Sequence, residues 1–148
     1  MEPIRRILVA TDFSQHSARA LEAALDLALQ FRAEVDVVHA FDLPIPLLTP
    51  YEVAVPDSYL DQTRNAAAKK LAEVADQASA RGIEVKTHLR EVPAAAAIAQ
   101  AAEDIAADLI VMGTRGNTGL KHVLLGSVAE RTLRLAPCSV LTVKGDDP

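Results

Sequence analysis

Glycines gather in one stretch of the chain, and their spacing is typical of a site for an anion. Four of the six glycines fall within fourteen residues: Gly113, Gly116, Gly119 and Gly126. Because glycine lacks a Cβ, the backbone can come close to a ligand there, and successive N–H groups can point into one concavity. Ser127 follows directly and begins a predicted helix, whose N–H groups and positive dipole end favour phosphate. This stretch is predicted to cradle a phosphate group.

Spacing excludes two common phosphate-binding motifs. The chain has no G-x-x-x-x-G-K-[ST], so it lacks a P-loop, and no G-x-G-x-x-G follows the first apolar run. The pattern is instead G-x-x-G, nine residues, then G-S. Asp12 is the one carboxylate expected beside this loop, and it would either contact a ligand or only satisfy the N–H groups of a turn. Neither paired carboxylates nor a His–Asp arrangement is evident, so no catalytic residue is assigned.

Apolar runs that alternate with helical patterns predict one α/β domain over residues 1–148. Strands are expected at 6–11, 34–41, 83–92, 109–112 and 139–144, with helices after Ser14 and over 57–78, 93–106 and 127–136. Alternation of this kind implies right-handed crossovers and a parallel sheet.

The strand sequences also predict the order of the strands. Strands one and four are continuously apolar, as central strands buried on both faces are. Strand three carries charged or polar residues on one face, which would be costly at the centre of a sheet, as the order 2-1-3-4-5 requires. We therefore expect an open, five-stranded, Rossmann-like sheet of order 3-2-1-4-5 with helices on both faces. A ligand should bind where strands one and four end, because the strand order reverses there.

The same segments resemble the universal stress protein family over essentially the whole chain. The shared motifs are Ile7-Leu-Val-Ala-Thr-Asp-Phe-Ser14, Val37-Val-His-Ala-Phe41, Leu125-Gly-Ser-Val-Ala-Glu-Arg131 and Ala136-Pro-Cys-Ser-Val-Leu-Thr-Val143. Every glycine of the family's ATP-binding signature is present, so the chain looks like the branch that binds ATP. The resemblance implies the strand order above, a homodimer and a cytoplasmic role in stress survival.

The resemblance also implies which residues bind ATP, or a relative such as ADP or AMP. Asp12, with Thr11 beside it, and the backbone around Ala40 would meet the adenosine half, and Met112 would border it. The phosphates would be held by Gly113, Gly116, Gly126, Ser127 and Val128, with Arg115 nearby. Mg²⁺ would accompany the nucleotide. Ser127-Val-Ala-Glu130 also fits a capping box, and Arg115 is equally consistent with a solvated loop charge.

Composition narrows the partners. A formal net charge of −5 and 3% aromatic residues argue against nucleic-acid binding. The one cysteine, Cys138, is expected to be a small buried apolar residue, and a lone cysteine favours a reducing, cytoplasmic compartment. The apolar run 7–10 is too short to span a membrane, so no membrane partner is expected. The last strand, 139–144, is apolar on both faces and is expected to pair with a second copy.

Three functions remain open at this point. A nucleotide-binding stress regulator without efficient turnover is favoured. The alternative is a slow ATPase, or a nucleotidyl- or phosphoryl-transferring enzyme, which would need metal ligands and a group that positions the nucleophile. A nucleotide-free dimeric scaffold is the third, and the intact glycine signature argues against it.

Overall fold

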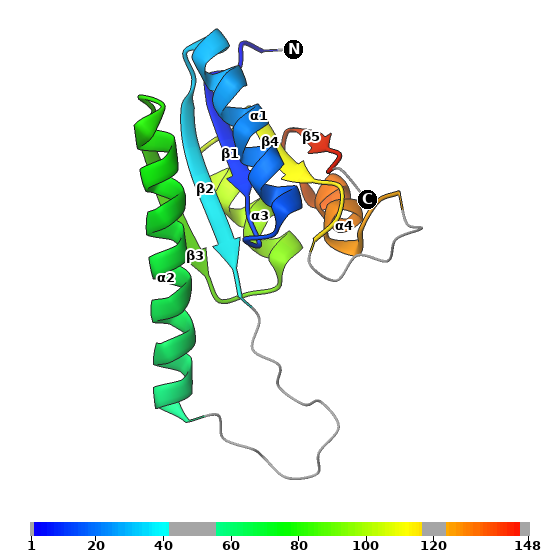
Figure 1. Ribbon diagram of the computed structural model, residues 1–148. Coiled ribbons are helices and arrows are strands. Elements are labelled where there is room, and N and C mark those ends of the chain that lie inside the picture. The colour runs from blue at the N-terminus through cyan, green and yellow to red at the C-terminus, as the bar shows by residue number, and fades with distance from the viewer. Residues whose placement is uncertain (1, 42–55, 117–123, 146–148) are drawn as a thin grey trace.

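One sheet of parallel strands organises the fold, and the computed structural model describes residues 2–41, 56–116 and 124–145. Within these residues, five strands alternate with four helices. They are β1 (Arg6–Ala10), α1 (Gln15–Phe31), β2 (Glu34–Ala40), α2 (Asp57–Ala80), β3 (Val85–Arg90), α3 (Ala94–Asp104), β4 (Leu109–Gly113), α4 (Ser127–Leu135) and β5 (Ser139–Val143). The strands lie in the order β3-β2-β1-β4-β5, and neighbouring strands are parallel (Figure 1). The predicted order is confirmed.

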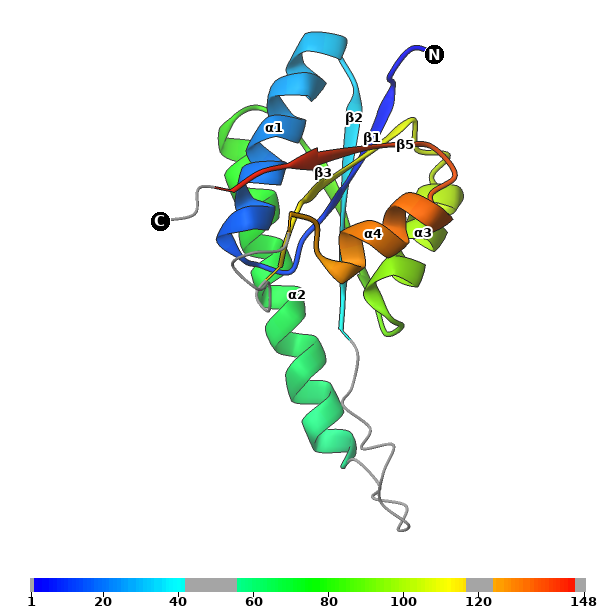
Figure 2. The same ribbon diagram turned by 90° about the vertical axis from the view of Figure 1, so that its right-hand side faces the viewer.

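Helices cover both faces of the sheet, as predicted. α1 and α2 lie on one face, and α3 and α4 lie on the other (Figure 2). In β1, Ile7 and Val9 pack towards α1, whereas Leu8 and Ala10 pack towards α3. All four side chains are buried, which explains why the central strand is apolar throughout.

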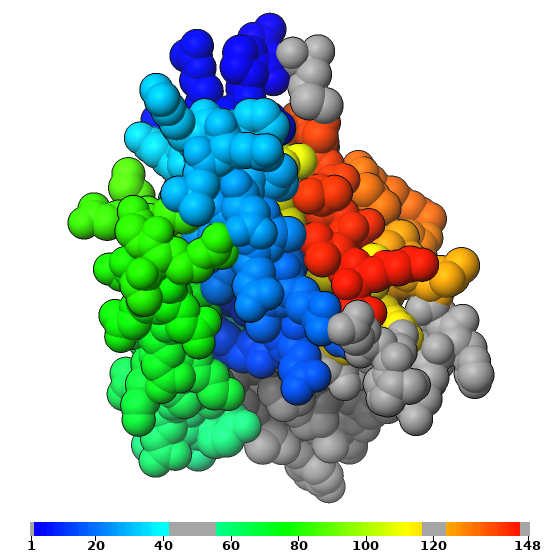
Figure 3. All heavy atoms as spheres, turned by 45° about the horizontal axis from the view of Figure 1, so that its top comes forward, coloured from blue at the N-terminus to red at the C-terminus, as the bar shows by residue number. Residues whose placement is uncertain are grey.

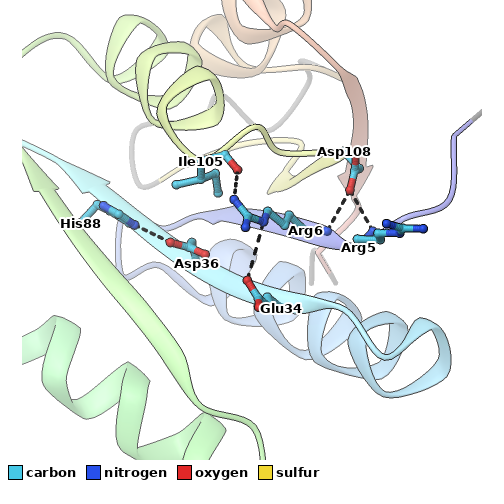
Figure 4. Close-up of polar contacts among 7 residues, drawn as sticks. All are labelled: Arg5, Arg6, Glu34, Asp36, His88, Ile105 and Asp108. Carbon is cyan, nitrogen blue, oxygen red and sulfur yellow. Dashed lines mark hydrogen bonds and ion pairs between the residues drawn. The ribbon is translucent and has the colours of Figure 1, made fainter.

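The polar face of β3 lies at an edge of the sheet, where its side chains find charged partners. His88 Nε2 lies 2.6 Å from Asp36 Oδ2 on β2 (Figure 4). Arg90 donates to Asp104, the last residue of α3, at 2.8 Å. The Asp36 side chain is only 7% exposed, because β2 lies between β1 and β3. This buried pair was not predicted, since Asp36 stands among valines in the sequence.

A second polar cluster joins the amino ends of the central strands (Figure 4). One carboxylate oxygen of Asp108 accepts hydrogen bonds from the backbone N–H groups of Arg5 and Arg6, at 2.8 and 2.9 Å. The Arg6 guanidinium donates to the Ile105 carbonyl oxygen at 2.8 Å and lies 3.7 Å from the Glu34 carboxylate. These bonds hold the start of β1 against the start of β2 and the residue before β4. They therefore support the register of the three central strands.

Helix boundaries agree with the predicted ones to within a few residues. Ser14 is the N-cap of α1, as predicted, and its hydroxyl accepts a hydrogen bond from the Ser17 N–H. Gly82 follows α2 with a φ of 79°, which glycine adopts without strain, and this explains why the helix ends there. Across the described residues, the helices are not long and apolar enough for any of them to cross a membrane.

Candidate functional site

The strand order reverses between β1 and β4, and open parallel sheets bind ligands at such a point. The two strands are direct neighbours, with Val9 opposite Val111. The chain leaves β1 through Thr11 and Asp12 and leaves β4 after Gly113. The topology therefore brings together the two segments that were predicted to form the site.

The turn after β1 holds Asp12 in place. The Thr11 N–H donates to the Val38 carbonyl oxygen at 3.0 Å, which ties the turn to β2. The Thr11 hydroxyl accepts a hydrogen bond from the Phe13 N–H at 3.0 Å, and Asp12 Oδ1 accepts one from the Ser14 N–H at 2.9 Å. One oxygen of Asp12 therefore satisfies a turn N–H, while its Oδ2 lies against the loop that follows β4.

Gly113 and Gly116 occupy positions where an added Cβ would require a neighbouring group to shift. A Cβ added to Gly116 would overlap Oδ2 of Asp12, so the carboxylate lies directly against the backbone of the loop. A Cβ on Gly113 would come within 3.1 Å of the Arg115 carbonyl oxygen and of the His16 Cβ. Glycine suits both positions because the backbone itself approaches neighbouring groups.

The far end of the loop returns to β4 at the N-terminus of α4. The Gly126 N–H donates to the Thr114 carbonyl oxygen at 2.7 Å, and a Cβ on Gly126 would lie 3.3 Å from that oxygen. Gly126 is the extended N-cap of α4, and no side chain caps this helix. The capping-box interpretation of Ser127 is therefore wrong, because Ser127 is the first helical residue. Ser127 and Val128 are exposed in a first turn whose N–H groups lack partners within the helix.

Apolar residues flank this loop on the α3 and α4 face. Met112 is buried in the same cluster as Ala10 and Val38. Ala40 is half-buried and lies on that face too, because it follows Val38 by two residues along β2. Arg115, between the glycines, is half-buried. Every predicted site residue thus lies at the carboxyl edge of the sheet.

Three further side chains meet at this edge on the opposite face, and they were not predicted as site residues. Phe13 has a φ of 64°, an outlier for a bulky residue, and its ring centroid lies 4.2 Å from that of His39. Lys70 of α2 holds its Nζ atom 5.4 Å from the centroid of the Phe13 ring. The sequence contained one sign of this cluster. Side chains alternate along β2, so His39 and Phe41 are placed on the face opposite Ala40.

The lowered pKa of His39 leaves its imidazole uncharged at neutral pH, and its hydrogen bond defines the tautomer. Burial lowers its pKa from the ordinary value of 6.5, outweighing the Thr11 hydrogen bond and the Asp12 charge that raise it. Its Nδ1 lies 2.7 Å from the Thr11 carbonyl oxygen, which can only accept, so Nδ1 carries the proton. Nε2 is therefore an acceptor.

Other candidate groups contribute less to the site. In the described ranges, no group of three or more His, Cys, Asp or Glu side chains could hold a metal ion. Cys138 is half-buried against the α3 and α4 core, and burial, followed by the Asp108 charge, raises the pKa of its thiol. Gly119, the remaining glycine of the cluster, lies outside the described residues.

Fold and site together define an open, parallel α/β protein with a glycine loop at its strand reversal. The chain matches the universal stress protein family over residues 3–144. Universal stress protein MJ0531 of Methanocaldococcus jannaschii is 37% identical over 95% of this chain and 82% of its own length. Universal stress protein YxiE of Bacillus subtilis is 33% identical over 94% of this chain and 98% of its own length. The solved structure of hypothetical protein MJ0577 is 28% identical, with a TM-score of 0.85 over 99% of this chain and 100% of that one. The chain belongs to the universal stress protein family.

Proposed function

We propose that this protein binds an adenine nucleotide, ATP or a relative such as ADP or AMP, at the carboxyl ends of β1 and β4. One observation carries the proposal: the loop backbone packs Gly116 against the Asp12 carboxylate and Gly126 against the Thr114 carbonyl. This packing brings the loop backbone close to the strand ends, and the uncapped first turn of α4 presents N–H groups without partners in the helix, together with the positive end of its dipole, to an anion. Phosphate suits this environment.

The proposed roles follow the position of each residue. The apolar face beside Met112 and Ala40 would receive the base, and Thr11 and Asp12 would meet the ribose. Gly113, Gly116, Gly126, Ser127 and Val128 would hold the phosphates, with Arg115 beside them. A Mg²⁺ ion bound to the phosphates would need only one or two protein carboxylates, and Asp12 is the carboxylate at this position.

Two proteins with the same fold were solved with adenine nucleotides. One is a universal stress protein in complex with cAMP, 24% identical with a TM-score of 0.70. The other, from Archaeoglobus fulgidus, is in complex with dAMP, 23% identical with a TM-score of 0.67. At these identities the two structures share only the fold with this chain. The proposed nucleotide site therefore rests on the glycine loop.

We further propose that the protein is a cytoplasmic stress regulator with slow or absent turnover, formed by one domain over 1–148. Phosphoryl transfer needs a group that positions the attacking nucleophile, and no such group has been assigned beside Asp12. Binding without rapid hydrolysis suits a sensor. We also propose a homodimer through 139–144, because β5 pairs with β4 on one side and its other side is an edge of the sheet.

A pair of glycine substitutions tests the nucleotide site. In Gly116→Ala the new Cβ displaces the Asp12 carboxylate, and we expect ATP binding to weaken by about tenfold or more. Gly82→Ala is the control: its positive φ makes alanine strained by roughly 1–2 kcal/mol, but Gly82 follows the distant end of α2. It should lower stability and leave the affinity for ATP unchanged. Calorimetric titration of nucleotide-free protein measures both affinities, and circular dichroism checks folding.

A folded Gly116→Ala variant that binds ATP as tightly as the parent would contradict the proposed cradle. Turnover is measured on the same preparations. Release of ADP at about one per second, typical of a modest enzyme, would favour the enzymatic alternative.

A further inference from the structure

A hollow of about 450 Å³ lies at the carboxyl edge of the sheet, on the face opposite the proposed nucleotide site. Phe13, His39 and Phe41 line it from the sheet side, and Tyr59 and Lys70 line it from α2. The first turns of α2 extend beyond the ends of the strands (Figures 1 and 2). The volume falls within the range of small-molecule pockets.

Apart from Asp12, the residues that line the hollow differ from those proposed to bind nucleotide. Successive residues of a strand point to opposite faces, so His39 and Phe41 face α2, whereas Ala40 faces α3. Met112 is likewise buried towards α3 and α4. Asp12 is the one proposed nucleotide residue that also borders the hollow.

Aromatic rings form much of its wall. Phe13 is held at a φ of 64° with its ring against that of His39. Strained backbone of this kind persists only where its surroundings stabilise it, and it gathers at functional sites. Phe41 and Tyr59 add two more rings. Such walls suit a planar aromatic ligand, which can make offset-stacked or edge-to-face contacts with these rings.

Several polar side chains line the hollow, among them Asp12, Gln62 and Thr63, and the proposal uses two others, His39 and Lys70. Nε2 of His39 is an acceptor, because Nδ1 donates to Thr11. Lys70 brings a positive charge, and none of the ion pairs formed between described residues involves it. A ligand that satisfies both groups carries one hydrogen-bond donor and one negative group.

We propose that this hollow binds a small planar aromatic carboxylic acid with a ring hydroxyl or N–H group, stacked beside Phe13 and Phe41 with its carboxylate at Lys70 and its donor at His39. The ring and charge contacts of this site come from residues that have no role in the proposed nucleotide site, and Asp12 borders both.

The test uses 6-hydroxy-2-naphthoate as a probe with the full chain. Calorimetric titration should detect binding, and Lys70→Gln should weaken it by about fivefold or more. Lys69→Gln is the matched control, because it removes the same charge from the preceding, exposed residue of α2, which does not line the hollow. His39→Asn keeps a donor near Thr11 but loses Nε2, so it should weaken the hydroxy acid more than it weakens 2-naphthoate.

Amide chemical shifts locate the probe independently of these variants. We expect the largest changes in amide chemical shift around 39–41 and in the first half of α2. We also expect the probe to bind equally well with and without saturating ATP. Three results would each overturn it: no binding to folded protein at millimolar probe, equal losses in Lys70→Gln and Lys69→Gln, or displacement by ATP with shifts around 126–128. If Gly116→Ala bound ATP as tightly as the parent, the nucleotide proposal would be contradicted, but the probe-binding results would still stand. The two proposals can therefore be contradicted independently.

Discussion

At the residue scale, His39 shows how one side chain links two elements. Its Nδ1 proton bridges β2 to the turn after β1 through the Thr11 carbonyl, and its ring packs at a tilt against that of Phe13. Burial is the main cause of its lowered pKa, with Asp12 and Lys70 as the nearby charges. Between that lowered pKa and 6.5, the unfolded chain binds a proton that the folded protein does not. Stability should therefore fall as the pH drops from about 6.5.

His39→Asn tests this dependence, because asparagine keeps a donor near the Nδ1 position and does not titrate. We expect the parent to lose stability relative to the variant between about pH 7.5 and about pH 5.5. Urea unfolding at the two pH values measures the difference. A constant difference between parent and variant would show that His39 is not the titrating group.

At the scale of elements, the β2–β3 edge depends on a contact between the buried Asp36 carboxylate and the His88 imidazole. Asp36 lies inside the sheet and takes His88 as its partner at 2.6 Å. Removing the imidazole in His88→Ala leaves the carboxylate without it, and we expect a loss of about 2 kcal/mol in the free energy of unfolding. Lys86→Ala is the control on the same strand, where the side chain is exposed, and it should change stability by less than about 0.5 kcal/mol.

Denaturant unfolding of both variants distinguishes the loss of the Asp36–His88 contact from a general effect of truncating a side chain on β3. Equal losses in the two variants would mean that the edge responds to any truncation of β3, rather than to the loss of the Asp36 partner.

At the scale of the whole molecule, β5 closes one end of the sheet with an exposed edge. Its residues lie at the surface beside α1 (Figure 3). Leu141 is 38% exposed, although the strand is largely apolar. An apolar strand at an open edge is normally covered, and an isologous contact between two copies would cover both.

We expect the parent to have the mass of a dimer by light scattering at tens of micromolar, and Leu141→Lys to shift it towards the monomer. A buried lysine would be costly at such an interface. Leu29→Lys is the control, because it places the same charge on another exposed leucine, 54% exposed and outside β5. A monomeric parent would contradict the proposed dimer.

The sequence alone determined the strand order, and it predicts the edge at which we propose that a ligand binds. Continuous apolar runs can be satisfied only by burial on both faces, and the polar alternation of β3 is tolerated only at an edge. The glycine spacing was informative because glycine leaves room for backbone to approach other groups. Gly116 against Asp12 is the clearest case.

Only the tertiary structure decided which side chains meet across elements. Phe13, His39 and Lys70 come from three separate segments, and Asp36 and His88 from two strands, so no local spacing connects them. The cap of α4 was likewise decided by the loop, which turns Gly126 back onto Thr114 and moves Ser127 into the helix. Local patterns report which face is buried, whereas contacts between distant residues depend on register and on how the helices pack.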